Sequence, residues 1–216
     1  ELMEIMRGFK KEGKSILFEA QLGALRDIDF GIFPYTSSSS SNAGYACVGA
    51  GIPGSHVDRT VGIVKAYSTC VGEGPFTAEW FGDEAEQLRV AGAEYGAATG
   101  RPRRVGPIDL VATRYGCRIQ GATEVALTKL DVLSYMKEIP VCTQYEVNGE
   151  KTDDFPFTAV IDEAKPVLTT VPGWGCDISG VRKYEDLPQA ARDYVEYVEQ
   201  AIGVHISYVS VGAGRD

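Results

Sequence analysis

A lysine and an aspartate close a short apolar segment in the sequence Thr128-Lys129-Leu130-Asp131. A carboxylate can accept two parallel hydrogen bonds from the ring N–H and the amino group of guanine, a pair that adenine does not offer. A lysine stem can lie along the face of a purine while its ammonium stays in water. The K-x-D spacing puts both side chains on one side of an extended segment. Lys129 and Asp131 therefore predict a guanine site; the alternative is a surface ion pair at a strand end.

A basic cluster lies in Gly96-Ala97-Ala98-Thr99-Gly100-Arg101-Pro102-Arg103-Arg104, where three of the last four residues are arginines. Guanidinium groups grip carboxylates and phosphates through paired hydrogen bonds. The whole chain has 21 Lys and Arg against 30 Asp and Glu, a formal net charge of −9. An anion must therefore be held by a local cluster such as this one. We predict a mobile loop that closes over an anionic substrate; the alternative is a solvated basic turn.

Two further segments carry weaker signals. Asp27-Ile28-Asp29, followed by the hydroxyl-rich residues 36–42, could orient a phosphate or a ribose. Residues 209–215 (VSVGAGR) predict a strand that ends in a turn of small residues, whose backbone can approach a ring closely.

Two glycine patterns match nucleotide-binding motifs. Gly8 to Ser15 fits G-x-x-x-x-G-K-S, but the predicted order is helix, match, strand, the reverse of what a phosphate loop needs, so we reject it. Gly49, Gly51 and Gly54 fit G-x-G-x-x-G ahead of a predicted helix. They carry the alternative hypothesis of an NAD(P)-binding oxidoreductase domain.

Composition narrows the class of protein. Of the 216 residues, 44% are hydrophobic and 24% charged, as in ordinary globular domains. The acidic balance argues against a nucleic-acid-binding protein, and no apolar run reaches the roughly 18 residues of a membrane span. The five cysteines include no Cys-x-x-Cys pair and only two histidines accompany them, so we expect no metal site and reduced thiols in a cytoplasmic protein.

The hydrophobic periodicity predicts alternating helices and strands. Helices are expected over residues 1–9, 55–68, 84–95, 108–118 and 188–202. Strands are expected over residues 15–20, 125–132, 140–147, 165–171 and 205–211. This order predicts a single α/β unit over residues 1–216 with a largely parallel sheet, preceded at residues 1–14 by the end of a helix and a turn.

Several segments together carry a family resemblance that each alone would not. They are LFEAQLGALRDIDFGIFPYTSSS, VGIVKAYSTCVGEGPFTAEWF, YGAATGRPRRVGPIDLVATR, ALTKLDVL, VPGWG, LPQAARDYVE and SVGAGRD. In this order they resemble the C-terminal half of the adenylosuccinate synthetase family, from about Ser15 to the last residue. The resemblance implies an α/β fold with a mixed, largely parallel central sheet and flanking helices, part of a P-loop-NTPase-like fold.

The resemblance also implies an activity. The family uses GTP to join IMP and L-aspartate into adenylosuccinate, with Mg²⁺ as cofactor, in purine biosynthesis. Its members are cytoplasmic homodimers. The family's phosphate loop, Mg²⁺ ligands, general base and general acid belong to the N-terminal half. We therefore expect this chain to be the C-terminal portion of a longer enzyme, with no catalytic or metal-binding residue of its own and no ligase activity alone.

The family's binding residues carry over to matching positions. For GTP they are Arg103, Lys129, Leu130, Asp131, Ser210, Val211 and Gly212. For the loop that binds aspartate they are Ala97, Ala98, Thr99, Gly100, Arg101, Pro102 and Arg103. For IMP they are Gln21, Leu22, Ser37 and Arg101.

The sequence departs from the family pattern at a few positions, two of them among these binding residues. Leu22 stands where the family has an IMP-contacting glutamine, and Gln21 comes one residue early. Phe30 replaces a histidine and Pro102 replaces an arginine.

Overall fold

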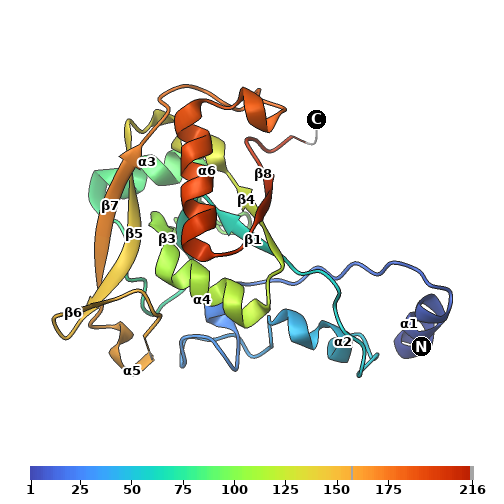
Figure 1. The fold of residues 1–216 in the computed structure, drawn as a ribbon. Coiled ribbons are helices and arrows are strands. Elements are labelled where there is room, and N and C mark those ends of the chain that lie inside the picture. The colour runs from blue at the N-terminus through green and yellow to red at the C-terminus, as the bar shows by residue number, and fades with distance from the viewer. Residues whose placement is uncertain (157, 215–216) are drawn as a thin grey trace.

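Two β-sheets form the centre of the molecule, and helices pack around them (Figure 1). The computed structural model describes residues 1–156 and 158–214 of the chain. The helices are α1 (Leu2–Lys11), α2 (Ala46–Gly49), α3 (Gly82–Gly92), α4 (Leu110–Gln120), α5 (Thr158–Ile161) and α6 (Gln189–Ile202). Short 3₁₀ helices are η1 (Ala24–Arg26), η2 (Ala43–Tyr45), η3 (Leu130–Tyr135) and η4 (Tyr184–Asp186).

The first sheet is parallel throughout and has the strand order β1-β4-β8. Its strands are β1 (Val61–Lys65), β4 (Glu124–Thr128) and β8 (Ile206–Val209). Because parallel strands end at the same edge of a sheet, the segments that follow β4 and β8 lie next to each other. Each outer strand keeps one edge without a partner strand among the described residues.

The second sheet is mixed. It contains β2 (Tyr67–Cys70), β3 (Arg104–Asp109), β5 (Glu138–Val147), β6 (Glu150–Thr152) and β7 (Lys165–Pro172). β3 and β5 pair in parallel, whereas β2 pairs antiparallel with β3, and both β6 and β7 pair antiparallel with β5. The two sheets together confirm the predicted α/β fold with a mixed sheet and flanking helices.

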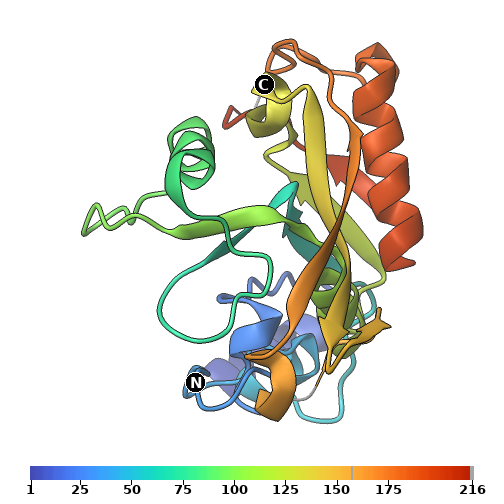
Figure 2. The same ribbon diagram turned by 90° about the vertical axis from the view of Figure 1, so that its left-hand side faces the viewer.

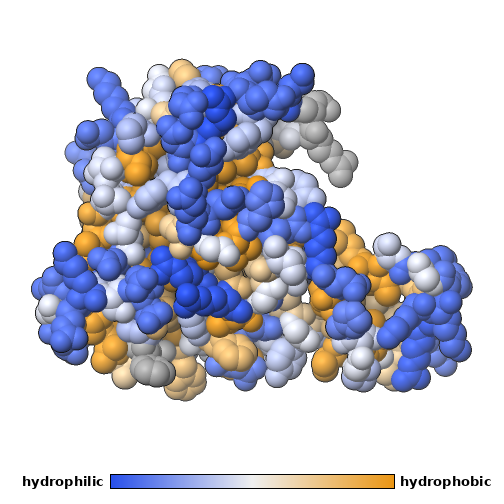
Figure 3. Space-filling view, in the orientation of Figure 1, coloured by the Kyte–Doolittle hydropathy of each residue, from blue (hydrophilic) through white to orange (hydrophobic). Residues whose placement is uncertain are grey.

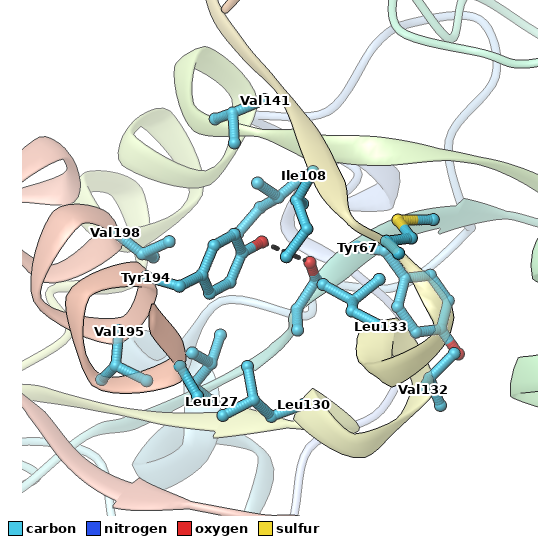
Figure 4. Packing of buried hydrophobic residues seen from close by; sticks show 14 of the residues in the cluster. Tyr67, Ile108, Leu127, Leu130, Val132, Leu133, Val141, Tyr194, Val195 and Val198 are labelled. Atoms are coloured by element: carbon cyan, nitrogen blue, oxygen red, sulfur yellow. Dashed lines mark hydrogen bonds between the residues drawn. The ribbon is translucent and has the colours of Figure 1, made fainter. Parts of the chain in front are cut away.

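The main core lies between the two sheets and extends to α6 on one side and α3 on the other (Figure 4). Leu127 and Leu130 point from β4 and η3 toward Tyr194, Val195 and Val198 on α6. The Tyr194 hydroxyl donates to the carbonyl oxygen of Ala66 at 2.6 Å, which satisfies the polar atom that this ring carries into the core. The core therefore holds the carboxyl end of the parallel sheet rigidly against a long helix.

The two ends of α4 follow from local chemistry. The Asp109 side chain accepts from the backbone N–H of Ala112 and caps the helix start, and Gly121 ends the helix in a left-handed conformation. Asp109 also accepts from the Tyr145 hydroxyl at 2.5 Å, and its burial raises the pKa of this carboxyl.

The surface in the orientation of Figure 1 is divided between hydrophilic and hydrophobic patches (Figure 3). The N-terminal helix α1 lies at one extremity of this view (Figure 1) and exposes Leu2, Met3 and Ile5. None of the helices in residues 1–156 and 158–214 has the length and apolar character needed to cross a bilayer. All five cysteines are free thiols.

Most of the predicted elements are present within a few residues, but two predictions were wrong. Residues 15–20 form no strand, and Leu17 is 95% exposed, because an apolar run becomes a strand only where another strand pairs with it. The predicted helix over 55–68 is instead a loop followed by β1 and the start of β2. The β-branched Val61, Ile63 and Val64 favour an extended backbone, which pairs in register with β4.

The glycine pattern at residues 49–54 does not form a dinucleotide-binding unit. Gly49 ends α2 instead of following a strand, and a loop leading to β1 follows Gly54 instead of a helix. The space that a side chain at Gly51 would need is occupied by Met3 of α1, so this turn is packed against a helix and not open to a ligand.

Candidate functional site

The two segments assigned to guanine meet at the carboxyl edge of the parallel sheet. The Leu130 N–H donates to the Ser210 carbonyl oxygen at 3.1 Å, and the Ser210 N–H donates to the Leu127 carbonyl oxygen at 2.8 Å. The Ser210 hydroxyl then closes the following turn by donating to the Gly212 carbonyl oxygen at 3.3 Å. Parallel pairing of β4 with β8 therefore brings residues 129–131 and 210–212 together. Arg215, which the sequence placed in the same turn, lies outside the described residues.

Lys129 has an unusual backbone and an anchored side chain. Its φ is 61°, in the left-handed region that is costly for a residue with a Cβ. The ammonium donates to the Gly92 carbonyl oxygen at 2.6 Å and to Glu94 Oε1 at 2.9 Å. Both ends of the side chain are thus fixed, and the hydrocarbon stem spans the gap between β4 and the end of α3.

Asp131 lies in the first turn of η3, and its carboxylate makes no hydrogen bond to another side chain within residues 1–156 and 158–214. Partial burial raises its pKa above the usual value, the nearby Lys129 charge works against this shift, and Asp177 adds to it. A carboxylate without a side-chain partner at a half-buried position is placed to accept hydrogen bonds from a ligand.

The arginine-rich loop forms a hairpin that projects beside α3 (Figure 2). The Gly96 N–H donates to the Arg101 carbonyl oxygen and the Gly100 N–H to the Gly96 carbonyl oxygen, both at 2.8 Å. Arg101 is exposed at this hairpin, whereas Arg103 Nη1 donates to Glu94 Oε2 at 2.7 Å. Arg104 leaves the loop and pairs with Glu79 at the start of β3. The three arginines therefore have three different environments.

Glu94 is the residue that sequence reasoning missed. It is 0% exposed and is surrounded by Lys65, Tyr67, Arg103 and Lys129. Burial opposes ionisation, but hydrogen bonds from Tyr67, Lys129 and Lys65 outweigh it and lower the pKa of Glu94 to about 2. The only signal in the sequence was an acidic residue at the end of a predicted helix, immediately before the arginine-rich loop.

The cluster around Glu94 has an excess of positive charge. Three cations surround one carboxylate, and burial lowers the pKa of Lys65 despite its ion pair with Glu94. The Nε–H of Arg103 is buried and has no acceptor among the described residues. An unsatisfied donor beside an excess of positive charge favours the binding of an anion here.

The residues assigned to IMP are only partly together. Leu22 and Ser37 line one pocket of about 810 Å³, whereas Gln21 and Arg101 lie outside its lining. Lys65 from the Glu94 cluster also lines this pocket and connects it to the arginine-rich loop. Leu22 has a left-handed backbone with φ 67° and is largely exposed.

Asp27 organises the serine-rich loop and has no free oxygen to offer a phosphate or ribose. Its two oxygens accept from the backbone N–H groups of Asp29, Phe30, Ser41 and Asn42 at 2.6–3.0 Å. Burial opposes its ionisation, but these bonds prevail and lower the pKa of Asp27. Asp27 therefore fixes the loop that carries Ser37, and the prediction that this segment orients a phosphate or a ribose stays a prediction.

A second pocket, of about 720 Å³, opens beside the turn at residues 210–212, between β8, residues 179–187 and the face of α6 that carries Val195 and Glu199. Its polar lining includes Arg182, Lys183 and Glu199. Within residues 1–156 and 158–214, no cluster of three or more His, Cys, Asp or Glu could hold a metal ion.

Comparison with known proteins agrees with this arrangement. The sequence model of the adenylosuccinate synthetase family matches residues 1–216. The chain belongs to the adenylosuccinate synthetase family. An adenylosuccinate synthetase from Bifidobacterium adolescentis is 48% identical over 206 residues, which is 95% of this chain and 48% of that protein. One from Sorangium cellulosum is 48% identical over 213 residues, 99% of this chain and 50% of the relative.

The fold agrees as well. The structure of fully ligated adenylosuccinate synthetase from Plasmodium falciparum superimposes with a TM-score of 0.93 at 35% identity, covering 98% of this chain and 51% of that one. The chain thus spans about half the length of the adenylosuccinate synthetases it matches. Family membership confirms the resemblance drawn from the sequence, and the NAD(P) alternative has no support.

Proposed function

We propose that this chain is the guanine- and aspartate-binding portion of a GTP-dependent ligase that joins IMP and L-aspartate to form adenylosuccinate. GTP phosphorylates the 6-oxygen of IMP, and the aspartate amine then displaces that phosphate. The proposal rests on membership of the adenylosuccinate synthetase family and on one observation above all. Residues 129–131 and 210–212 are hydrogen-bonded side by side, with the carboxylate of Asp131 left available.

Each ligand has a proposed place. Asp131 accepts from the N1–H and amino group of guanine, the Lys129 stem lies along the base, and residues 210–212 close on it. Arg103 is proposed to reach the GTP phosphates from the base of the hairpin, where an anion is favoured. Residues 97–103 close over aspartate, with Thr99 and Arg101 as the polar contacts.

IMP is proposed to bind at the pocket that Leu22 and Ser37 line, with Arg101 brought to its ribose when the hairpin closes. At position 22 a leucine offers no hydrogen bond, so the family's glutamine contact is absent unless Gln21 takes its place. Leu22 has a strained left-handed backbone, so a change of backbone conformation in this turn is the proposed way for Gln21 to replace Leu22 in the site.

The remaining properties are proposed from the family alone. They are residence in the cytoplasm, a homodimeric parent enzyme and Mg²⁺ ligands supplied from outside this chain. We also propose that the chain alone forms no adenylosuccinate, because the family's general acid and general base belong to the N-terminal half. Measurable adenylosuccinate formation by the isolated chain would overturn that part.

Guanine recognition can be tested on the chain itself. GDP should raise its melting temperature and ADP should not, because adenine cannot pair with the Asp131 carboxylate. Equal shifts with both nucleotides would point to phosphate binding without base recognition, and no shift with either would contradict a guanine site formed by this chain.

A further inference from the structure

The carboxylate of Glu94 receives donors from four separate segments of the chain. Oε1 accepts from Lys65 Nζ at 2.9 Å, from the Tyr67 hydroxyl at 2.5 Å and from Lys129 Nζ at 2.9 Å. Oε2 accepts from Arg103 Nη1 at 2.7 Å. The donors come from β1, β2, the end of β4 and the base of the arginine-rich hairpin. No other carboxylate in the described residues links these segments.

Glu94 also fixes the hairpin through its main chain. The Arg103 N–H donates to the Glu94 carbonyl oxygen at 2.9 Å, so the residue holds both the backbone and the guanidinium of Arg103. On the other side, Lys129 is held at its tip by Glu94 and by the carbonyl oxygen of Gly92, two residues before Glu94. A single short segment after α3 thus sets the position of both basic side chains.

We propose that Glu94 is a positioning residue that couples recognition of the guanine base to recognition of the anion. Glu94 itself does not touch the ligands. It draws the Lys129 ammonium away from the site, which leaves the hydrocarbon stem extended across the position of the base. It also fixes the guanidinium of Arg103 at the base of the hairpin, where the buried Nε–H has no acceptor among the described residues. The naming of base and anion rests on the proposed function; the anchoring of the two side chains does not.

This arrangement removes a cost of binding. A lysine or arginine that becomes ordered only on contact with its ligand loses rotamer freedom at that moment. Here the Glu94 carboxylate orders Lys129 and Arg103 before any ligand binds. Because both side chains share this carboxylate, a movement of one affects the position of the other. Loss of the Glu94 charge should therefore reduce what the base and what the phosphates each contribute to the free energy of nucleotide binding.

The anchoring is tested first without any nucleotide, by limited amine labelling and mass spectrometry. Glu94→Gln should raise the labelling rate of Lys129 several-fold relative to the exposed Lys11, because the ammonium loses its charged partner. Glu94→Asp keeps the charge and should restore part of the protection. The matched control is Glu124→Gln, which removes a buried carboxylate paired with Arg59 at the opposite end of β4. Unchanged labelling of Lys129 in Glu94→Gln would overturn the proposal.

The coupling is tested next, by measuring the affinities of guanosine and GDP for the same variants. Glu94→Gln should lower the affinity for guanosine about tenfold or more. It should also lower the ratio of GDP affinity to guanosine affinity. Glu124→Gln should leave both quantities unchanged. A loss of melting temperature in Glu94→Gln with both affinities intact would mean that Glu94 is purely structural. If the unaltered chain binds neither compound while the labelling result holds, the guanine assignment fails and the anchoring by Glu94 stands. Should Glu94→Gln not fold, the two single variants Glu94→Asp and Tyr67→Phe are used for both tests. Tyr67→Phe removes one hydrogen-bond donor to Glu94 and keeps every charge.

Discussion

The buried charge of Glu94 makes a prediction about stability that can be worked from the structure. Its pKa is about 2 in the folded chain against an ordinary value of 4.5. A difference of roughly 2.5 units at about 1.4 kcal/mol each corresponds to about 3 kcal/mol of stability at neutral pH. Replacement by Gln removes this contribution and leaves Lys65, Arg103 and Lys129 without their common anion. We expect a fall in melting temperature of about 6–12 °C for a chain of this size.

The sign of the pH dependence follows from the direction of the shift. Because the folded pKa lies below the unfolded one, the contribution of Glu94 is complete above about pH 4.5 and is lost as the pH falls toward 2. The difference in stability between the unaltered chain and Glu94→Gln should therefore be largest at pH 6–7 and should shrink between pH 4.5 and 2. Asp27 and Glu124 also have lowered pKa values, but they are present in both proteins and cancel in the difference.

The assay is urea denaturation of both proteins at several pH values from 2.5 to 7, followed by circular dichroism. Glu94→Asp serves as the charge-preserving control and should keep most of the pH dependence. A stability difference of the same size at pH 3 and pH 7 would refute the reasoning, because it would show that the loss comes from packing and not from charge.

Three further predictions concern other carboxylates. Asp131→Asn should shift the binding preference from GDP toward xanthosine diphosphate by about 10- to 100-fold, because the charge-assisted pair with guanine is lost and xanthine offers the Asn amide an acceptor. Competitive binding of the two nucleotides measures this ratio, and an unchanged preference would contradict the assignment. Asp27→Asn should loosen residues 36–42 and speed their cleavage in limited proteolysis, whereas Asp29→Asn should not. Asp109→Ala should lower stability by about 2 kcal/mol or more through loss of the α4 cap and of the Tyr145 bond, measured by denaturation against Tyr145→Phe, which removes only the second.

The parts of the fold that could be read from the sequence are those whose signal is local. The helix α6 shows a continuous apolar stripe and a glycine after its end, and both are visible without any partner. The segment at residues 15–20 and the one at residues 55–68 needed information about pairing that neighbouring residues do not carry. A strand exists only with its partner, and the partner of β1 lies some sixty residues away along the chain.

The same reason explains which site hypotheses the sequence could suggest. Lys129 and Asp131 are two residues apart, so a joint role in guanine binding could be predicted from the sequence, and it stays a prediction. Glu94 acquires its role from donors that lie up to 35 residues away, and no spacing rule connects them. The glycines of residues 49–54 illustrate the converse error, because a motif matched by letters carried no function once its neighbours turned out to be a short helix and a loop.

The parallel sheet has two outer edges along which two copies of the chain could pair. β1 and β8 each present one row of backbone donors and acceptors that no described strand covers, and Ile63 and Tyr208 are 71% and 51% exposed on them. Two copies of the chain that paired along such edges would bury these side chains and stabilise each other in proportion to concentration. With such pairing, the melting temperature would rise with protein concentration even without a ligand. Variants and nucleotides should therefore be compared at a single protein concentration. A dilution series of the unaltered chain measures whether its melting temperature depends on self-association.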